Sequence, residues 1–258
     1  MRYAAIIDVD GIIFTIASVL KKAYTSAIET KNEYQLNKLD KQSTNMIQNK
    51  FREVFLYTNC DRFIGFIKGT NCNEYRKQID PLYKYKRKKD LILYQILNRI
   101  QDLAIKRYKL YSVNNIEVDD ACVITHHHYN KKYKEDINKK PILVSPDKDL
   151  LQIEGHHIRL LNIPEYMNIS KEEAQYKLYT QIITGDSVDG IKGIEGSGEV
   201  AAKKILNEPG HYARKVLNAY ITKYRKEGKA QYNKNFKLVF MLRYYKHFNI
   251  PKWILIEN

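Results

Sequence analysis

Short apolar runs that end at a glycine, a serine or an acidic residue recur through the first part of the chain. Longer stretches with helical spacing, such as 91–106 and 119–129, lie between them. A short apolar run is typical of a strand buried on both faces, and strands that alternate with helices form a parallel sheet. The pattern predicts an α/β fold, a mostly parallel central sheet flanked by helices. The predicted strands are 3–11, 53–58, 141–145 and 157–161.

Acidic side chains gather where the predicted strands end. In a parallel sheet these ends share one edge, which is where ligand sites form. So many carboxylates repel one another unless divalent cations neutralise them, and Mg²⁺ and Mn²⁺ prefer oxygen ligands. One such pair is common on a solvated helix start, but recurrence at matching positions favours a metal site. The residues are Asp8, Asp10, Asp61, Glu117, Asp119, Asp120, Asp147 and Asp149, with Asp186 and Asp189 at helical i,i+3 spacing.

The chemistry and the charge of the chain point toward nucleic acid. Two metal ions suit the hydrolysis of a phosphodiester, because one generates hydroxide and both stabilise the attacking and leaving oxygens. Lys and Arg number 44 against 29 Asp and Glu, a net charge of +15, which favours polyanionic partners. A generally basic proteome is the alternative explanation for the charge.

Several other classes of site have no support in the sequence. The 258 residues contain 3 cysteines without zinc-finger spacing and no GxSxG motif or P-loop. No apolar run is long enough for a membrane span, so we expect a cytoplasmic protein that does not bind membranes. The triplet His126, His127 and His128 is expected on a helix surface, because consecutive helical residues point in different directions.

The block ITGDSVDGIKGIEGSGEVAAKKIL, 183–206, combines acidic residues, glycines and a lysine pair. Glycines at this spacing allow a tight turn between two helices, and such a turn can present backbone N–H groups to a phosphate. The contact would not depend on the base sequence. An ordinary turn between helices is the alternative. The residues predicted to contact DNA are Gly193, Gly196, Gly198, Lys203 and Lys204.

Four motifs, IIDVDG, IEVDDA, LVSPDKDL and the 183–206 block, together resemble the 5′ nuclease family of flap endonucleases and 5′→3′ exonucleases in its bacteriophage and bacterial form. The resemblance implies a PIN-like catalytic core over 1–170 with a helical arch at about 81–106. It implies a helical region over 171–258 that carries a helix–three-turn–helix, a form of helix–hairpin–helix, at about 183–207. It also implies two Mg²⁺ ions, for which Mn²⁺ substitutes.

The resemblance assigns a role to each matching residue. Asp8 matches the aspartate of the first strand, with Asp10 as its neighbour and alternative. Asp120 and Asp147 lean toward one ion, and Asp149, Asp186 and Asp189 toward the other. The full set of implied metal ligands is Asp8, Asp61, Glu117, Asp119, Asp120, Asp147, Asp149, Asp186 and Asp189.

The second strand departs from the family pattern. The family places an aspartate after this strand, whereas the chain has Asn59 first and Asp61 two residues later. We predict that Asp61 takes the role and that 63–76 is an inserted hairpin.

The stretch PLYKYKRKKD, 81–90, resembles the Tyr-Lys-x-x-Arg signature at the base of the family's arch. Tyr83 is expected to stack on an unpaired base, and Lys84 and Arg87 to bind the phosphate at the reacting centre. A solvated basic helix start is the alternative.

The sequence thus predicts a monomeric, metal-dependent 5′ nuclease that hydrolyses DNA with a 5′ flap, nick or free 5′ end, and RNA–DNA hybrid, in replication or repair. One alternative is a DNA-structure-binding protein without hydrolytic activity. Another is a haloacid dehalogenase-type phosphatase, because DVDG fits its motif with Asp8 as nucleophile and Asp10 as acid and base. That reading gives no role to Glu117 or to the glycine block.

Overall fold

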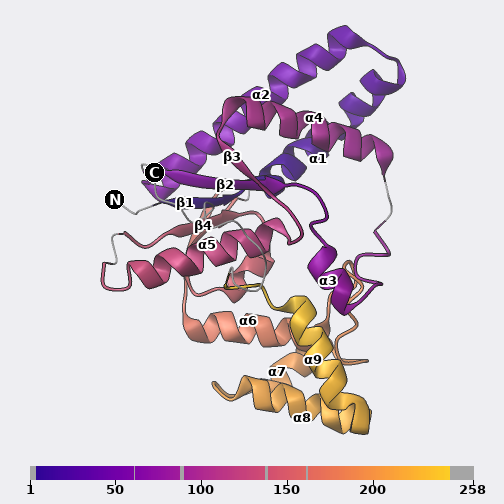
Figure 1. The fold of residues 1–258 in the computed structure, drawn as a ribbon, viewed down its shortest axis with the longest axis vertical. Coiled ribbons are helices and arrows are strands. Elements are labelled where there is room, and N and C mark those ends of the chain that lie inside the picture. Colours follow the sequence, from indigo (N-terminus) through magenta and orange to yellow (C-terminus); the bar gives the residue numbers. More distant parts are fainter. Residues whose placement is uncertain (1–3, 61, 88–89, 137–138, 161, 245–258) are drawn as a thin grey trace.

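A six-stranded sheet in the order β3–β2–β1–β4–β5–β6 forms the centre of the molecule (Figure 1). The structure is a computed structural model that describes residues 4–60, 62–87, 90–136, 139–160 and 162–244. Strands β1 to β5 run parallel and β6 runs antiparallel to β5, which confirms the predicted fold class. The strands are β1 (Ala5–Asp8), β2 (Phe63–Lys68), β3 (Leu110–Val113), β4 (Ile142–Ser145), β5 (Gly155–Arg159) and β6 (Glu165–Ile169).

Helices cover both faces of the sheet, because alternate side chains of each strand point to opposite sides. Ala5 and Ile7 of β1 join one core with three helices, whereas Ile6 faces a second core. The first face is covered by α1 (Val9–Glu29), α2 (Glu33–Thr58) and α4 (Leu91–Arg107), and the second by α5 (Val118–Lys132).

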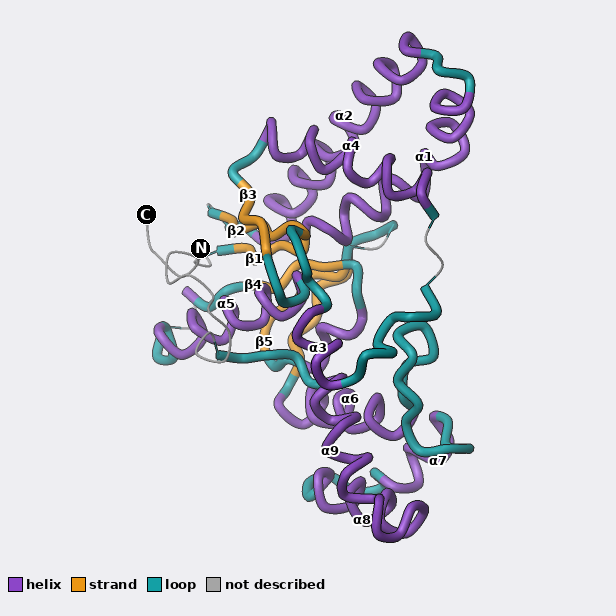
Figure 2. Tube along the Cα trace, turned by 45° about the vertical axis from the view of Figure 1, so that its right-hand side comes forward, coloured by secondary structure: helices purple, strands orange, loops and turns teal. Residues whose placement is uncertain are grey.

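A separate helical layer with its own core follows the sheet (Figure 2). Its helices are α6 (Lys171–Thr184), α7 (Glu199–Ile205), α8 (Tyr212–Tyr224) and α9 (Gly228–Val239). Short helix α3 (Glu74–Ile79) packs against α9 and so connects the sheet region to this layer. Two 3₁₀ turns complete the described elements, η2 (Lys148–Gln152) and η3 (Arg225–Glu227).

The prediction for 53–58 is wrong, because these residues form the last turns of α2 rather than a strand. Val54 and Thr58 are buried at helical spacing, whereas Leu56 between them is 81% exposed. The predicted inserted hairpin at 63–76 is also wrong. Its first part is β2, which pairs in parallel with β1, and its last part enters α3.

Helix α1 is long and apolar enough to cross a membrane by length and composition alone. In this fold Ile12, Ile16 and Leu20 are buried, and α1 packs against α2 and α4. A core helix has these same properties, so they do not contradict the expectation that the chain lacks a membrane span.

Acid should destabilise the fold through His157, which is 3% exposed and whose ring Nε2–H donates to the Ile153 carbonyl at 2.8 Å. Burial, with a smaller contribution from His156, lowers the pKa of His157 from 6.5 to about 4, although the hydrogen bond to Ile153 opposes the shift. The unfolded chain therefore takes up this proton first, and stability that is complete above pH 6.5 is lost as the pH falls toward 4. The loss should reach about 3 kcal/mol. Urea unfolding at several pH values measures it, and a His157→Gln variant should lose that slope while exposed His211→Gln keeps it.

Candidate active site

A groove of about 930 Å³ opens where the parallel strands end at their carboxyl edge. Asp8 ends β1, Asp147 follows β4, and Asp119 lies in the first turn of α5, and all three line the groove. Asp8 is 5% exposed, and its carboxylate accepts hydrogen bonds from Gly11 N at 2.9 Å and from Ser145 Oγ at 2.8 Å. Three elements that are distant in sequence thus bring carboxylates to one place, as the strand-end pattern predicts.

In one group of these carboxylates, burial raises the pKa of Asp8, Asp10, Asp119 and Asp149, and the exposed Asp147 adds a further negative charge beside them. We call these five the repelling carboxylates. Burial raises the pKa of Asp8 to about 6, and the charges of Asp10 and Asp147 add to the effect. Burial also raises the pKa of Asp119 far above its usual range, with Asp8 and Asp147 as the next causes. The arrangement stores electrostatic repulsion in the folded protein.

A second group, Glu117, Asp120 and Asp189, is neutralised by the chain itself, and we call these the paired carboxylates. Arg76 donates to both oxygens of Asp120, at 2.5 and 3.1 Å, and its Nη1 lies 3.2 Å from Glu117 Oε2. Lys84 forms an ion pair with Glu117, and Arg87 with Asp189. Burial raises the pKa of Glu117, but Arg76 and Lys84 outweigh it, so the pKa is lowered overall.

The repelling carboxylates have the charge and the donor atoms that a hard divalent cation requires. The charges of Asp8 and Asp147 raise the pKa of Asp119, and the charge of Asp147 also raises the pKa of Asp8. These three neighbouring side chains would hold such an ion. Among the residues that the structure describes, no three His, Cys, Asp or Glu side chains converge tightly enough to hold a metal ion without side-chain movement. The donor chemistry of these carboxylates fits Mg²⁺ or Mn²⁺.

The end of β2 contributes no carboxylate to the groove. Asp61 lies outside the described residues and precedes β2 in the chain, so the strand on which its predicted role depended comes after it. Lys68 and Gly69 stand at the carboxyl end of β2 instead. A Cβ atom at Gly69 would lie 2.3 Å from Asn114 Oδ1 and 2.7 Å from the Val113 carbonyl, which leaves no room for an aspartate side chain.

Solved structures with the same fold come from bacteriophage T5. The T5 protein co-crystallised with metal ions superposes with a TM-score of 0.67 at 14% identity, over 92% of this chain and 89% of that chain. The T5 5′-exonuclease with bound zinc gives a TM-score of 0.62 at 13% identity, over 98% and 91%. The chain has the 5′ nuclease fold. The resemblance that the motifs indicate is therefore confirmed at the level of the fold.

One further structure and one sequence relative are similar to this chain. The T5 flap endonuclease in complex with DNA and metal ions matches with a TM-score of 0.63 and 13% identity, over 98% of this chain and 91% of that chain. In sequence, the chain is 29% identical to DNA polymerase I of Borreliella burgdorferi over 181 residues, which is 58% of this chain and 19% of that protein. The chain thus spans about a fifth of the length of that relative. No protein-family model matches the chain.

Asp120 is not among the residues that line the groove, and its carboxylate has buried partners. It is 0% exposed, and Oδ1 also accepts the backbone N–H of Leu242 at 2.9 Å. Its oxygens are therefore committed to Arg76 and to the segment after α9. This geometry disfavours the predicted metal role of Asp120 and favours a structural one.

Asp149, Asp186 and Asp189 lie where the sheet meets the helical layer. Asp149 Oδ2 accepts a hydrogen bond from Gln181 at 2.9 Å, and Lys177 Nζ lies 3.9 Å from Asp149 Oδ1. Burial raises the pKa of Asp149, as do the charges of Asp147 and, to a smaller extent, Asp186. Asp186 Oδ1 accepts the backbone N–H groups of Val188 and Asp189. A turn thus fixes Asp186 and Asp189, and Asp186 lies close enough to Asp149 for its charge to affect that carboxylate.

The glycine block forms a hairpin between α6 and α7 in which only part of the predicted DNA contact is accessible. Gly193 has a φ of +48°, and a Cβ there would lie 2.4 Å from the Ile183 carbonyl, so its role is close packing of two chain segments. Gly196 and Gly198 face open space, and Lys203 and Lys204 are exposed on α7. These four residues remain predicted phosphate contacts.

Tyr83 is not available for base stacking in this structure, which corrects the prediction. It is 4% exposed, and its hydroxyl donates to Glu117 at 3.1 Å or to Asp189 at 3.0 Å. Burial, followed by the charge of Glu117, raises its pKa above the usual range. Exposed aromatic rings that line the same groove are Phe14, Tyr85 and Tyr94, at 54%, 58% and 45%. Sequence reasoning missed them and also missed Arg76.

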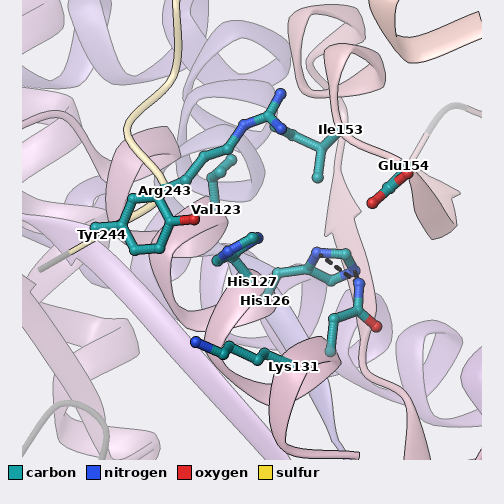
Figure 3. A pocket seen from close by; sticks show the side chains of 9 residues that line it. Val123, His126, His127, Lys131, Ile153, Glu154, Arg243 and Tyr244 are labelled. Carbon is teal, nitrogen blue, oxygen red and sulfur yellow. Dashed lines mark hydrogen bonds between the residues drawn. The ribbon is translucent and has the colours of Figure 1, made fainter. Parts of the chain in front are cut away.

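A second pocket, of about 350 Å³, lies beside α5 and contains part of the histidine triplet (Figure 3). His126 is buried rather than exposed, and its ring contacts the Asn130 amide at 3.3 Å. Burial lowers the pKa of His126 well below its usual range, with His157 as a further cause. The prediction of a surface position is therefore wrong for His126, whereas His127 and His128 are half-buried.

Proposed function

We propose that the chain is a structure-specific, divalent-metal-dependent 5′ nuclease that cuts phosphodiester bonds near 5′ ends of DNA in replication or repair. The observation that carries the proposal is the groove, whose lining combines Asp8, Asp10, Asp119 and Asp147 with Lys84 and Arg87. The 5′ nuclease fold supports it, because T5 proteins of this fold were crystallised with metal ions and with DNA.

The repelling carboxylates, together with Asp186 and the paired carboxylate Asp189, act in this proposal as the cation sites. Asp8, Asp119 and Asp147 hold a divalent ion, Mg²⁺ by donor chemistry with Mn²⁺ as a substitute, and Asp149, Asp186 and Asp189 serve a second. Bound ions of this kind supply hydroxide at neutral pH and stabilise charge on the phosphate oxygens. Asp8 is oriented by Gly11 N and Ser145 Oγ, so its position is fixed before substrate arrives.

The walls of the groove fit a single-stranded 5′ segment. Phe14 of α1, Tyr94 of α4 and Tyr85 between α3 and α4 present apolar rings to the groove, while Lys68 and Lys77 present positive charge. Stacking on such rings contributes about 1–3 kcal/mol per base and does not depend on base identity. DNA with a 5′ flap, nick or free 5′ end is therefore the proposed substrate, with RNA–DNA hybrid as a further one.

Duplex beyond the cut site would run along the helical layer. Lys203 and Lys204 on α7 and the open turn at Gly196 and Gly198 lie on its surface, and they are the proposed contacts to the phosphate backbone. The proposed protein is a monomer that works in the cytoplasm, either of a bacterium or of a phage-infected cell.

Cleavage of a 5′-flapped duplex tests the proposal directly. DNA labelled to report every cut is incubated with the full chain in Mg²⁺, in Mn²⁺ and in EDTA. We expect metal-dependent cuts near the junction or the 5′ end. Binding without cuts in either metal would favour the DNA-structure-binding alternative, with the missing carboxylate at the end of β2 as its physical cause. Release of phosphate from a small monoester without DNA cleavage would favour the phosphatase.

A further inference from the structure

Two lysines that line the groove take no part in the proposed cation sites or at the reacting phosphate. Lys68 is the last residue of β2 and Lys77 lies on α3, and both side chains are exposed. Neither forms an ion pair with a carboxylate that the structure describes, whereas Lys84 and Arg87 of the same groove do. The groove therefore contains two ammonium groups that are available to a ligand.

The backbone of Lys68 is fixed from two sides. Its N–H donates to Asp10 Oδ1 at 2.9 Å, and its carbonyl accepts a hydrogen bond from the Gln101 side-chain amide of α4, also at 2.9 Å. The next residue, Gly69, donates its N–H to the Val113 carbonyl at 2.9 Å. Asp10 is thus bonded to the backbone of Lys68 and not to its ammonium group, so Nζ can bind an anion from a position that is set in advance.

Lys77 is positioned by the residue before it. Arg76 is buried and donates to the Leu238 carbonyl at 2.9 Å and to Asp120, so α3 cannot rotate about its axis without breaking these bonds. Asn73 also lines the groove, and it precedes Lys77 by four residues, the spacing that places two side chains on one helix face. The Asn73 side chain makes no capping hydrogen bond with α3. An amide and an ammonium group therefore face the groove from the same side of α3.

Lys68 lies to one side of the proposed cation site. Strand β2 borders β1 on the side away from β4, and Asp8 is opposite Phe66 in the register of β1 and β2. Lys68 comes two residues after Phe66, which places it about 7 Å further along the strand. Asp8 and Asp147, at the ends of β1 and β4, are thus separate from this lysine. If the reacting phosphate of a DNA strand lies at the carboxylates, a neighbouring phosphate can reach Lys68.

We propose that Lys68 and Lys77, with Asn73, form a subsite for the 5′-terminal phosphate of the strand that is cut. This inference rests on the proposed function. A terminal phosphate monoester carries a charge of about −1.5 to −2 at pH 7, whereas a phosphate within a strand carries a single charge, so two ammonium groups match the terminal group better. The Asn73 amide donates a further hydrogen bond to it. The protein therefore prefers a phosphorylated 5′ end wherever that end lies in the groove, as at a nick.

Cleavage of two nicked duplexes that differ only in a 5′-phosphate or a 5′-hydroxyl at the nick tests the inference. In Mg²⁺ the full chain should cut the phosphorylated duplex with a kcat/KM at least about tenfold higher, because hydrogen bonds to charged groups contribute that much. The Lys68→Gln/Lys77→Gln variant should lose this preference. Lys38→Gln/Lys41→Gln is the matched control, since it removes two exposed charges from α2, outside the groove lining, and it should keep the preference.

Equal cleavage of the two duplexes by the unaltered protein would overturn the inference and leave the proposed function intact. A Lys68→Gln/Lys77→Gln variant that cuts both duplexes more slowly by the same factor would also overturn it, because the lysines would then attract DNA in general. A duplex with a long 5′ flap is a further control, since its 5′ end lies beyond the groove and its phosphate should have no effect.

A binding measurement decides the inference even without cleavage. The same nicked duplexes carry fluorescein at a 3′ end, and fluorescence anisotropy gives their Kd for Asp119→Asn in Mg²⁺, with and without Lys68→Gln/Lys77→Gln. Tighter binding of the phosphorylated duplex, by at least about tenfold and only when both lysines are present, would support the subsite. Equal Kd values would refute it. Absent cleavage by the unaltered protein in either metal would refute the proposed nuclease activity alone.

Discussion

Replacing Arg76 with methionine is expected to lower the free energy of unfolding by about 3–5 kcal/mol, the range typical when one member of a buried ion pair is removed. Arg76 is 3% exposed and Asp120 0%, so the substitution would leave the Asp120 carboxylate buried without its counter-charge. Glu117 would lose a second cation 3.2 Å away. Urea unfolding at pH 7, followed by circular dichroism, measures the loss.

The double variant Arg76→Met/Asp120→Asn separates loss of the charge pair from loss of packing. With both charges removed, much of the lost stability should return, because an uncompensated buried charge is more costly than a buried apolar group. Lys50→Met is the control, since the Lys50–Glu53 pair lies within α2 and is partly exposed. A double variant as unstable as Arg76→Met would show that packing of the guanidinium against α9, and not its charge, stabilises the fold.

The parts of the site that local sequence pattern determines could be predicted. Asp8 and Asp147 follow short apolar runs, and the rule that parallel strands end at one edge was enough to bring them together. The hairpin at 183–206 was predictable for the same reason, because a positive φ at Gly185 and Gly193 is a local property of glycine.

The parts that depend on packing between distant segments could not be predicted. The run VFLY within 53–58 is too short for apolar content to distinguish a strand from a helix end, and this error moved the expected end of the second strand. Nothing local to Arg76 indicates that α3 packs on α9 and places its guanidinium beside Asp120. Tyr83 is buried because it packs into the core of the helical layer and against the turn that carries Asp189, segments distant from it in sequence.

Adjacent residues Asp119 and Asp120 are expected to give opposite results when each is changed to asparagine. Asp119→Asn should lower the rate of flapped-DNA cleavage about 10³-fold or more, because a ligand of the proposed cation site is lost and metal ions contribute several kcal/mol to such reactions. The same change should leave the metal-free protein as stable or more stable, since it removes one of the repelling carboxylates. Single-turnover cleavage and thermal unfolding in EDTA measure the two effects.

Asp120→Asn should instead reduce stability, because Arg76 would keep its buried charge without the carboxylate that accepts two of its hydrogen bonds. Its cleavage rate should fall less than that of Asp119→Asn when both are measured on folded protein. Asp119 lines the groove, whereas Asp120 is bonded to the segment after α9, so the opposite results follow from the placement of the two side chains. If Asp119→Asn and Asp120→Asn lost the same amount of cleavage and were equally stable, Asp120 would be a metal ligand. Arg76 would then have to release Asp120 when the cation binds.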